Sequence, residues 1–522
     1  MAAVRLALFA YIARRLGMML LIVFGASFMA YNLEAISSNP LQAFAENTAK
    51  NKTYLMHQLI SQLNLDVPPP LRYFMWLRGV VAGLWGHLDL GMTRDHQPVL
   101  DSIALAIPIT FRLVIASTIL AIILGITIGM ITAIRQYSRF DYVMTFISFL
   151  LFSLPVFWVA VLLKQYLAID FNNFLEKPSI SLPFLIGFGL VAGLIMASLI
   201  GGSRRRFYSV FLGVTLGAIG LMKLISDTNW FIHPGIGIIG VGIFAFGFAI
   251  LVTQISTGLE NRKSLTAATS AAAIVTVGYY PLQLLMNSKS SFLNILLVLV
   301  ITMGLSGLIA YFVDKIDRRT NIRTALITAL LGTLPLFLDR LMQEFGGYMT
   351  SDAVSNRPVP TLGQVNDLLS DQQKANFWVS SLDGIMHLIL PTAALTLISF
   401  AGYVRFSRGS LLEVLNMDYI RTARAKGLTE RTVIVRHGMR NALLPLTTIL
   451  VNDFAGVIGG AIITEGVFQW KGMGQLFNQS LNTYDLNLFM GVFVLSAFLT
   501  VLANFVADLL YGVVDPRIRI RK

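Results

Sequence analysis

Residues 421–445 read RTARAKGLTERTVIVRHGMRNALLP and form a cationic island in an apolar chain. Six of these residues are Lys or Arg, and Glu430 is the one acidic residue among them. Long apolar runs lie on both sides of the island. Because basic residues concentrate in the cytoplasmic loops of membrane proteins, the island predicts a loop between two membrane spans.

The composition of the whole chain is that of a membrane protein. Of its 522 residues, 55% are hydrophobic and 13% charged, and the mean hydropathy is +0.70; a soluble domain is about a quarter charged. The net charge of +13 does not indicate nucleic-acid binding, because the basic residues fall in short loops between apolar runs. The sequence contains no Cys, which excludes disulfides, thiolate metal sites and a cysteine nucleophile.

A helix of about 20 apolar residues crosses a bilayer, and we predict twelve such spans. The first follows Arg14 and Arg15, as in a signal peptide, but it is long enough to span and no small-residue cleavage site follows it. The polar stretches 34–104 and 339–387 are predicted to lie at the outer surface. The predicted spans are 12–33, 105–134, 143–167, 181–202, 207–226, 235–256, 265–286, 292–313, 324–338, 388–404, 442–464 and 487–511.

The distribution of Lys and Arg predicts that both termini are cytoplasmic. With that orientation most basic residues lie inside, including those of 405–440 and of the C-terminal RIRIRK. The short outer loops then hold Lys177, Lys289 and Lys471. Removing one span would place a set of basic loops outside, so the pattern favours an even number of spans.

The loop itself has a helical pattern. We expect a helix from Leu411 to Lys426, ended by Gly427 at a C-cap, and a second helix from Thr429 towards Asn441. Two short helices joined at a glycine would form a compact docking element; the alternative is a basic loop that fixes topology and touches lipid headgroups. The face expected on the first helix comprises Leu412, Leu415, Tyr419, Thr422 and Ala423.

The runs RTARAKGL and RHGMRNALLP resemble the cytoplasmic loop of binding-protein-dependent ABC importer permeases, and within them the B-type subunit of the oligopeptide/dipeptide/nickel group. Three further segments are similar to the same group, with Lys471 standing where the group usually has Pro. They are LNLDVPPPLRYFMWLRGVVAGLWGHLDLG (63–91), GGAIITEGVFQWKGMGQLF (459–477) and NFVADLLYGVVDPRIR (504–519).

This resemblance implies an all-α, polytopic helical bundle in which a six-helix permease core carries about six inserted spans. The core would be divided into 1–170, with the outer segment 34–104, and 386–522, with the coupling loop 405–441. The insert would be 171–385, ending in the polar loop 339–387. No function follows for the insert; we expect a peripheral helical module that buttresses the core or binds lipid or an accessory subunit.

The function implied is that of the transmembrane subunit of an ATP-driven importer, moving peptides or a related solute from a solute-binding protein across the cytoplasmic membrane of a prokaryote. The chain has no GxxxxGK[ST] motif, so we expect no ATP site, no enzyme activity and no cofactor of its own. ATP and Mg would be held by two P-loop ATPase subunits. A second homologous permease subunit and membrane lipids complete the expected partners.

The resemblance also implies the site residues. The coupling loop would dock on an ATPase, and we interpret His437 as a contact of this loop because no second metal ligand stands at a suitable spacing. Arg421, Arg424 and Lys426 would make charge-assisted contacts. The expected coupling residues are Asp418, Arg421, Thr422, Ala423, Arg424, Ala425, Lys426, Gly427, Leu428, Arg436 and His437.

A second group is expected in the translocation pathway or its gate. Asp453 lies within a predicted span and shares a helix face with Gly456 and Gly460. Asp453 would meet a substrate amine or a hydrated cation, or else form a buried hydrogen bond to the partner permease beside a close glycine contact. Glu465 and Trp470, at the outer end, would belong to the gate or to the docking surface for a binding protein.

The sequence leaves two other functions open. A self-sufficient twelve-span carrier fits the number of spans, but its two halves would be expected to resemble one another, and the basic loop would be unexplained. A scaffold or lipid-interacting protein whose insert is the working part is the third possibility.

Overall fold

A computed structural model describes residues 2–41, 52–287, 289–314, 316–439, 441–443, 449 and 461–514. Over these residues the chain is helical, and the one β-type pairing is an isolated bridge between Met92 and Pro98. It divides into two compact units, 1–163 with 390–522 and 164–389. The sequence had placed the corresponding divisions after residues 170 and 385. Helix α17 (Phe377–Leu415) crosses the second division.

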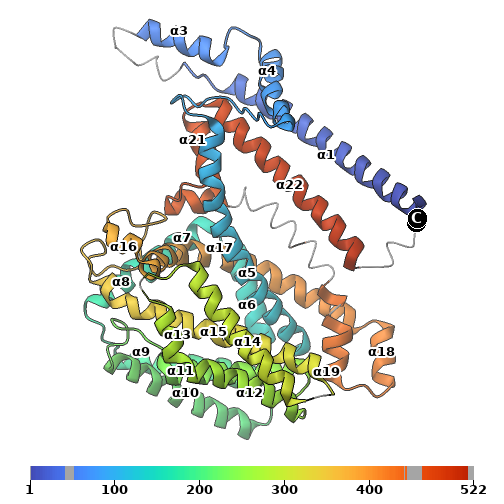
Figure 1. Ribbon diagram of the computed structural model, residues 1–522, viewed down its shortest axis with the longest axis vertical. Coiled ribbons are helices and arrows are strands. Elements are labelled where there is room, and N and C mark those ends of the chain that lie inside the picture. Colours follow the sequence, from blue (N-terminus) through green and yellow to red (C-terminus); the bar gives the residue numbers. More distant parts are fainter. Residues whose placement is uncertain are drawn as a thin grey trace. The chain divides into compact units, whose positions relative to one another are not determined.

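The first unit contains the helices on which the candidate site is built. Helices α1 and α22 run beside each other, and the N-terminal part of α22 also contacts α5 and α21 (Figure 1). Its core includes the aromatic residues Tyr31, Tyr73 and Trp76, packed ring against ring. The elements of this unit besides α17 are α1 (Ala2–Ser37), α3 (Lys52–Leu63), α4 (Pro69–Ala82), η1 (Gly83–Trp85), α5 (Val99–Ile134), α6 (Arg139–Ser153), α7 (Val156–Leu163), α18 (Asp418–Ala425), α19 (Glu430–Thr432), η3 (Val433–Met439), α21 (Met473–Asn482) and α22 (Leu486–Val514).

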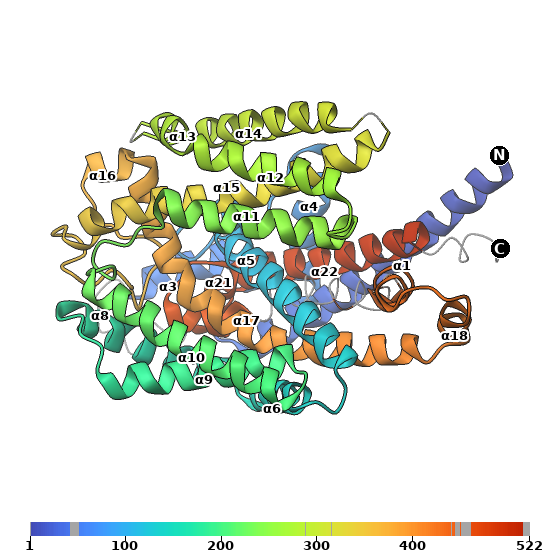
Figure 2. The same ribbon diagram turned by 90° about the horizontal axis from the view of Figure 1, so that it is seen from below.

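In the second unit, four helices pack on small side chains. Helices α11, α12, α14 and α15 lie side by side in Figure 2. Four alanines of α12 are fully buried against alanines of α11, α14 and α15: Ala267, Ala268, Ala271 and Ala272. Small residues let helix backbones approach closely where lipid gives no hydrophobic drive for association. The elements of this unit are η2 (Lys164–Ile169), α8 (Asp170–Glu176), α9 (Leu182–Ile200), α10 (Arg204–Asp227), α11 (Gly237–Ser256), α12 (Arg262–Val277), α13 (Tyr279–Leu285), α14 (Phe292–Val313), α15 (Arg318–Met349) and α16 (Asp371–Ala375).

Nine helices of the described residues are long and apolar enough to cross a membrane, or eleven if two bent pairs each count as one span. All eleven correspond to predicted spans, and the fold class is confirmed as helical and multi-pass. The bends are 105° between α6 and the segment Val156–Glu176, and 59° between α12 and α13. The twelfth predicted span, 442–464, lies almost entirely outside the described residues.

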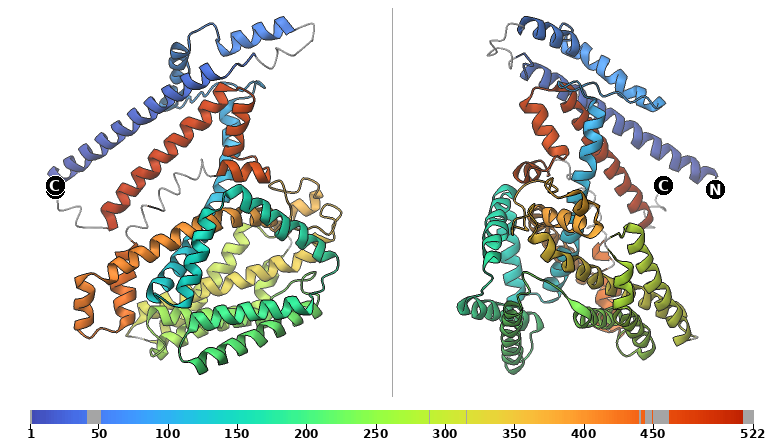
Figure 3. Two further views of the ribbon diagram at one scale, coloured as in Figure 1. Left: turned by 180° about the vertical axis from the view of Figure 1, so that it is seen from behind. Right: turned by 60° about the vertical axis from the view of Figure 1, so that its left-hand side comes forward.

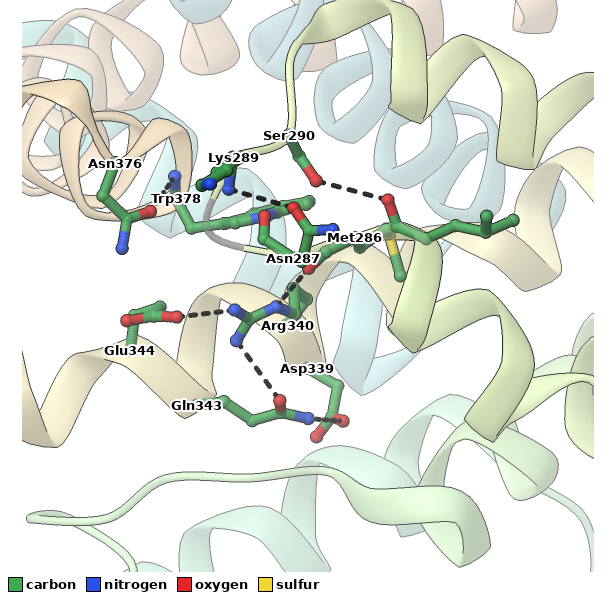
Figure 4. A network of polar contacts seen from close by, with 11 residues as sticks. Met286, Asn287, Lys289, Ser290, Asp339, Arg340, Gln343, Glu344, Asn376 and Trp378 are labelled. Atoms are coloured by element: carbon green, nitrogen blue, oxygen red, sulfur yellow. Dashed lines mark hydrogen bonds and ion pairs between the residues drawn. The ribbon is translucent and has the colours of Figure 1, made fainter.

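The prediction of an outer polar loop from residue 339 to residue 387 is wrong at both ends. Helix α15 continues to Met349 and α17 begins at Phe377. Polar side chains of α15 find partners on the helix itself: Arg340 pairs with Glu344 at 2.6 Å. Figure 4 shows this arginine also donating from Nε to the carbonyl oxygen of Met286, at 2.6 Å. Such pairing lets a helix continue through a polar stretch.

Candidate functional site

The basic loop folds as a short helix that follows the end of α17. Helix α18 carries Asp418 in its first turn and Arg424 in its last turn, which suits the helix dipole. Ile420 is fully buried and Ala423 nearly so, in a cluster with residues from the ends of α5 and α17 and from η3. In Figure 3, the orange chain turns after α17, and α18 lies beside the segment that follows it.

The single helix predicted from Leu411 to Lys426 is wrong. Helix α17 ends at Leu415, and α18 begins at Asp418 after a break at Asn416 and Met417. The break changes the register, so the expected common face does not form. Leu411, Val414, Ile420 and Ala423 are buried, whereas Tyr419 and Thr422 are exposed.

Gly427 ends α18 in the manner expected for a C-cap glycine. Its φ is +74°, a left-handed backbone conformation that residues other than Gly and Asn adopt only at an energetic cost. The amide of Gly427 donates to the carbonyl oxygen of Arg424 at 3.0 Å, and the amide of Leu428 donates to that of Ala423 at 3.4 Å. This pair of bonds is the Schellman motif. Apart from its two neighbours in the chain, no heavy atom of the described residues lies within 4 Å of a Cβ atom built at Gly427, so its surroundings there are open.

Two side-chain contacts hold α18 against the segment after the turn. Arg424 Nε lies 2.8 Å from Glu430 Oε1. Asn441 Nδ2 donates to the hydroxyl of Tyr419 at 2.7 Å. The second predicted helix is found in part: Thr429 caps α19, which runs directly into a π-helix, η3, ending at Met439. The loop is thus a closed helix–turn–helix unit.

The outward surface of this unit carries most of the expected coupling residues. Arg421 Nη1 lies 3.5 Å from Asp418 Oδ1, and both side chains are exposed. Thr422, Arg424, Ala425, Lys426 and Leu428 are also exposed, whereas Ala423 faces inward. His437 is half-buried in η3; Arg436 is in the same element, and its side chain is outside the description. Their roles in docking remain predictions.

The helices behind the loop are joined by close contacts. Gly125 and Gly129 of α5 form a small-xxx-small pattern, and the hydroxyl of Ser407 on α17 donates to the carbonyl oxygen of Gly125 at 3.2 Å. Arg408 donates twice to Asp141 at the start of α6. The loop therefore follows a set of helices, α5, α6 and α17, that are packed against one another. The sequence reasoning missed this anchor, although the GITIG pattern at 125–129 was a signal for it.

Glu465 lies between α5 and α21 and is fully buried. Its carboxylate accepts from Thr110 Oγ1 at 2.6 Å and from the amides of Gly474 and Gln475 at 2.8 and 3.1 Å. Burial raises the pKa of the Glu465 carboxyl, and these donors oppose that rise. Glu465 thus ties α5 to the N-terminus of α21. Trp470 is buried too. The gate role of Glu465 stays a prediction.

The predicted pathway residues Asp453, Gly456 and Gly460 lie outside the described residues.

Comparison with known proteins assigns a family to the C-terminal part of the chain. Residues 324–520 match the family described as "Binding-protein-dependent transport system inner membrane component". This range includes α17, the loop and the outer turn at Glu465.

Three relatives are oligopeptide or dipeptide permeases. The chain is 48% identical over 136 residues to the oligopeptide transport system permease protein AppB of Bacillus subtilis (strain 168), covering 26% of this chain and 43% of the relative. It is 46% identical over 141 residues to the dipeptide transport system permease protein DppB of Escherichia coli (strain K12), covering 27% and 42%. It is 25% identical over 510 residues to the oligopeptide transport system permease protein OppB of Mycobacterium tuberculosis (strain ATCC 25618 / H37Rv), covering 98% and 99%.

The two more similar matches thus span less than half of the relatives' length, whereas the third spans almost all of it. Together with the family match, they bear out the resemblance seen in the basic loop and in the outer turn. The chain is thus a helical, multi-pass membrane protein whose C-terminal part is similar to the inner membrane components of binding-protein-dependent transport systems, the oligopeptide and dipeptide permeases among them.

Proposed function

We propose that the chain is the transmembrane subunit of an ATP-driven importer, which receives a solute from a solute-binding protein and moves it across the cytoplasmic membrane. The names of its relatives support peptides, or a chemically related solute, as the cargo. Two P-loop ATPases supply the energy and hold ATP and Mg, and a second permease completes the pathway. Both termini and the loop 405–441 are cytoplasmic.

The observation that carries the proposal is the closed unit from Asp418 to Leu428. It presents an exposed cationic surface outward, while Ile420 and Ala423 anchor it to the ends of α5 and α17. Rigid-body motion of a docked ATPase would pass through such an element to the membrane helices. A loop that served only topology or lipid attraction would need basic residues, but no Schellman turn or buried backing.

The test compares Gly427→Val with Gly427→Asn in the complex reconstituted with its ATPases and binding protein. Val at φ +74° costs about 1–2 kcal/mol of strain, whereas Asn tolerates this conformation. We expect the Val variant to assemble but to lose most of its binding-protein-stimulated ATP hydrolysis and solute uptake, and the Asn variant to retain them. Since a Cβ at Gly427 contacts nothing in the described part of the chain beyond its two neighbours, loss in both variants would indicate that an ATPase surface comes close to Gly427.

Two results would overturn the proposal. One is that no ATPase associates with the purified chain. The other is that the Val variant hydrolyses ATP and transports as the wild type does. Uptake by proteoliposomes containing this chain alone, driven by an ion gradient, would favour a carrier instead.

A further inference from the structure

Arg72 is a buried cation with unsatisfied donors. It lies in α4, is 8% exposed, and its Nε and Nη1 atoms have no hydrogen-bond partner among the described residues. A guanidinium does not deprotonate in proteins. Leaving such a charge buried without a counter-charge costs several kcal/mol. The protein therefore gains stability from any anion that reaches this group.

A cavity of about 40 Å³ adjoins Arg72. Its polar lining comes from Tyr31, Ser38 and Asn487, and the remaining lining residues are apolar. The phenol of Tyr31 lies beside the guanidinium, and the amide nitrogen of Asn487 is engaged with the carbonyl oxygen of Met92 at 2.9 Å. No carboxylate is among the lining residues of the described chain. This volume exceeds the roughly 10–15 Å³ that one particle of the size of a water molecule needs, so a small ion fits.

The cavity lies where the outer segment meets two spans. Ser38 follows α1, Arg72 belongs to the segment 34–104, and Asn487 lies in the first turn of α22. With the orientation proposed above, this end of the spans faces the outside, where small inorganic anions of the medium are available. An anion here would hold α1, α4 and α22 together through one charge.

We propose that this cavity binds a single small anion of the size of chloride, with Arg72 as the residue that holds it. The anion accepts a hydrogen bond from a free donor of the guanidinium and supplies the missing counter-charge, with the Tyr31 phenol beside it. The hydroxyl of Ser38 lines the same space but donates to the carbonyl oxygen of Glu34 at 2.6 Å. The inference concerns the stability of the outer segment. It uses the proposed orientation of the chain but does not depend on the proposed transport function.

The test measures the apparent melting temperature of the complete chain in lipid nanodiscs at constant ionic strength, with sodium gluconate replaced stepwise by sodium chloride. Binding to the folded state raises stability with saturation. We expect a saturable rise of roughly 2–4 °C for the wild type, and none for Arg72→Leu. Removing a buried unpaired charge is often neutral or stabilising, so Arg72→Leu should melt no lower than the wild type in gluconate. The control is Arg78→Leu, which removes an exposed arginine of the same helix.

Several results would overturn the inference. If Arg72→Leu melts lower by the same amount in both salts, Arg72 is a packing residue. If every variant responds equally to chloride, the effect is a general one of the salt. If the wild type does not respond to chloride, the cavity holds no exchangeable anion. Soaking crystals in bromide gives a second readout: an anomalous peak beside Arg72 supports the site, and its absence at saturating bromide contradicts it.

Discussion

Arg408 of α17 forms a bidentate pair with Asp141 of α6, donating from Nε to Oδ1 at 2.8 Å and from Nη2 to Oδ2 at 3.0 Å. Asp141 is 3% exposed and also accepts from the amide of Tyr137 and the hydroxyl of Thr145. The pair joins the start of α6 to the part of α17 that precedes the loop. Bidentate pairs of this kind fix geometry as well as charge.

Breaking this pair should be costly. Asp141→Asn leaves Arg408 without its counter-charge, and we expect the free energy of unfolding to fall by roughly 3 kcal/mol. Arg408→Lys keeps the charge but loses one of the two bonds, so its effect should be smaller. The double variant Asp141→Asn/Arg408→Leu should lose less than the losses of Asp141→Asn and Arg408→Leu added together. Melting temperatures of the wild type, the three single variants and the double variant provide the measurement. Strict additivity would show that the pair contributes nothing as a pair.

The glycine contact between α5 and α17 should tolerate no side chain. A Cβ at Gly129 would overlap Ser407 Oγ and stand 2.6 Å from the carbonyl oxygen of Val404. We expect Gly129→Leu to lower the melting temperature strongly, and Ser407→Ala to rescue it little, because the Val404 backbone remains. Gly409→Ala serves as the control: it lies on α17, and a Cβ there has no described atom within 4 Å beyond its chain neighbours and its own helix backbone. An unaffected Gly129→Leu protein would refute the close packing.

Variants of the Arg424–Glu430 ion pair can distinguish a role in folding the loop from a role in docking. Both side chains are well exposed, so Arg424→Ala should change stability by no more than about 1 kcal/mol. If Arg424 also contacts an ATPase, the charge-swapped variant Arg424→Glu/Glu430→Arg keeps the internal pair but should still lose stimulated ATP hydrolysis. Full activity of the swapped protein would restrict Arg424 to holding the loop together.

The buried carboxyl of Glu465 makes stability depend on pH. Its pKa in the folded protein is raised by burial, whereas in the unfolded chain it is about 4.3. The folded state therefore holds the proton more tightly. The resulting stabilisation is complete below the unfolded pKa and is lost as the pH rises through the folded pKa.

Glu465→Gln should flatten this part of the melting profile and lower stability at neutral pH by about 1–3 kcal/mol, because the amide cannot accept all three hydrogen bonds. The exposed Glu413→Gln is the control. An unchanged pH profile in Glu465→Gln would assign the dependence to another group.

The membrane spans could be predicted from the sequence because a run of about 20 apolar residues is long enough to cross a bilayer. In lipid such a segment must form a helix, since only then are its backbone hydrogen bonds made within the segment. The same rule failed for α15, where Arg340, Gln343 and Glu344 are polar yet helical. Their partners are one turn away or on another helix, as with Asp339, which accepts from the amides of Ile236 and Gly237. A hydropathy scale assigns such residues to a loop because it contains no information about their hydrogen-bond and ion-pair partners.

The candidate site was only partly predictable for a similar reason. Gly427 could be placed because a left-handed helix end requires glycine, a local demand. The break at Asn416 and Met417 was missed because the apolar period continues across it. The contact of Asp141 with Arg408 joins residues 267 positions apart, a separation over which a single sequence gives no signal.

The closed form of the loop has a consequence for how a partner would meet it. The Schellman turn, the Arg424–Glu430 pair and the Tyr419–Asn441 bond already order the segment in the isolated chain. Docking would therefore require little further loss of conformational entropy and no folding step. Such a surface captures a partner by rigid collision, so the association rate should be set by diffusion and by the cationic charge of the loop, and it should fall as salt screens that charge.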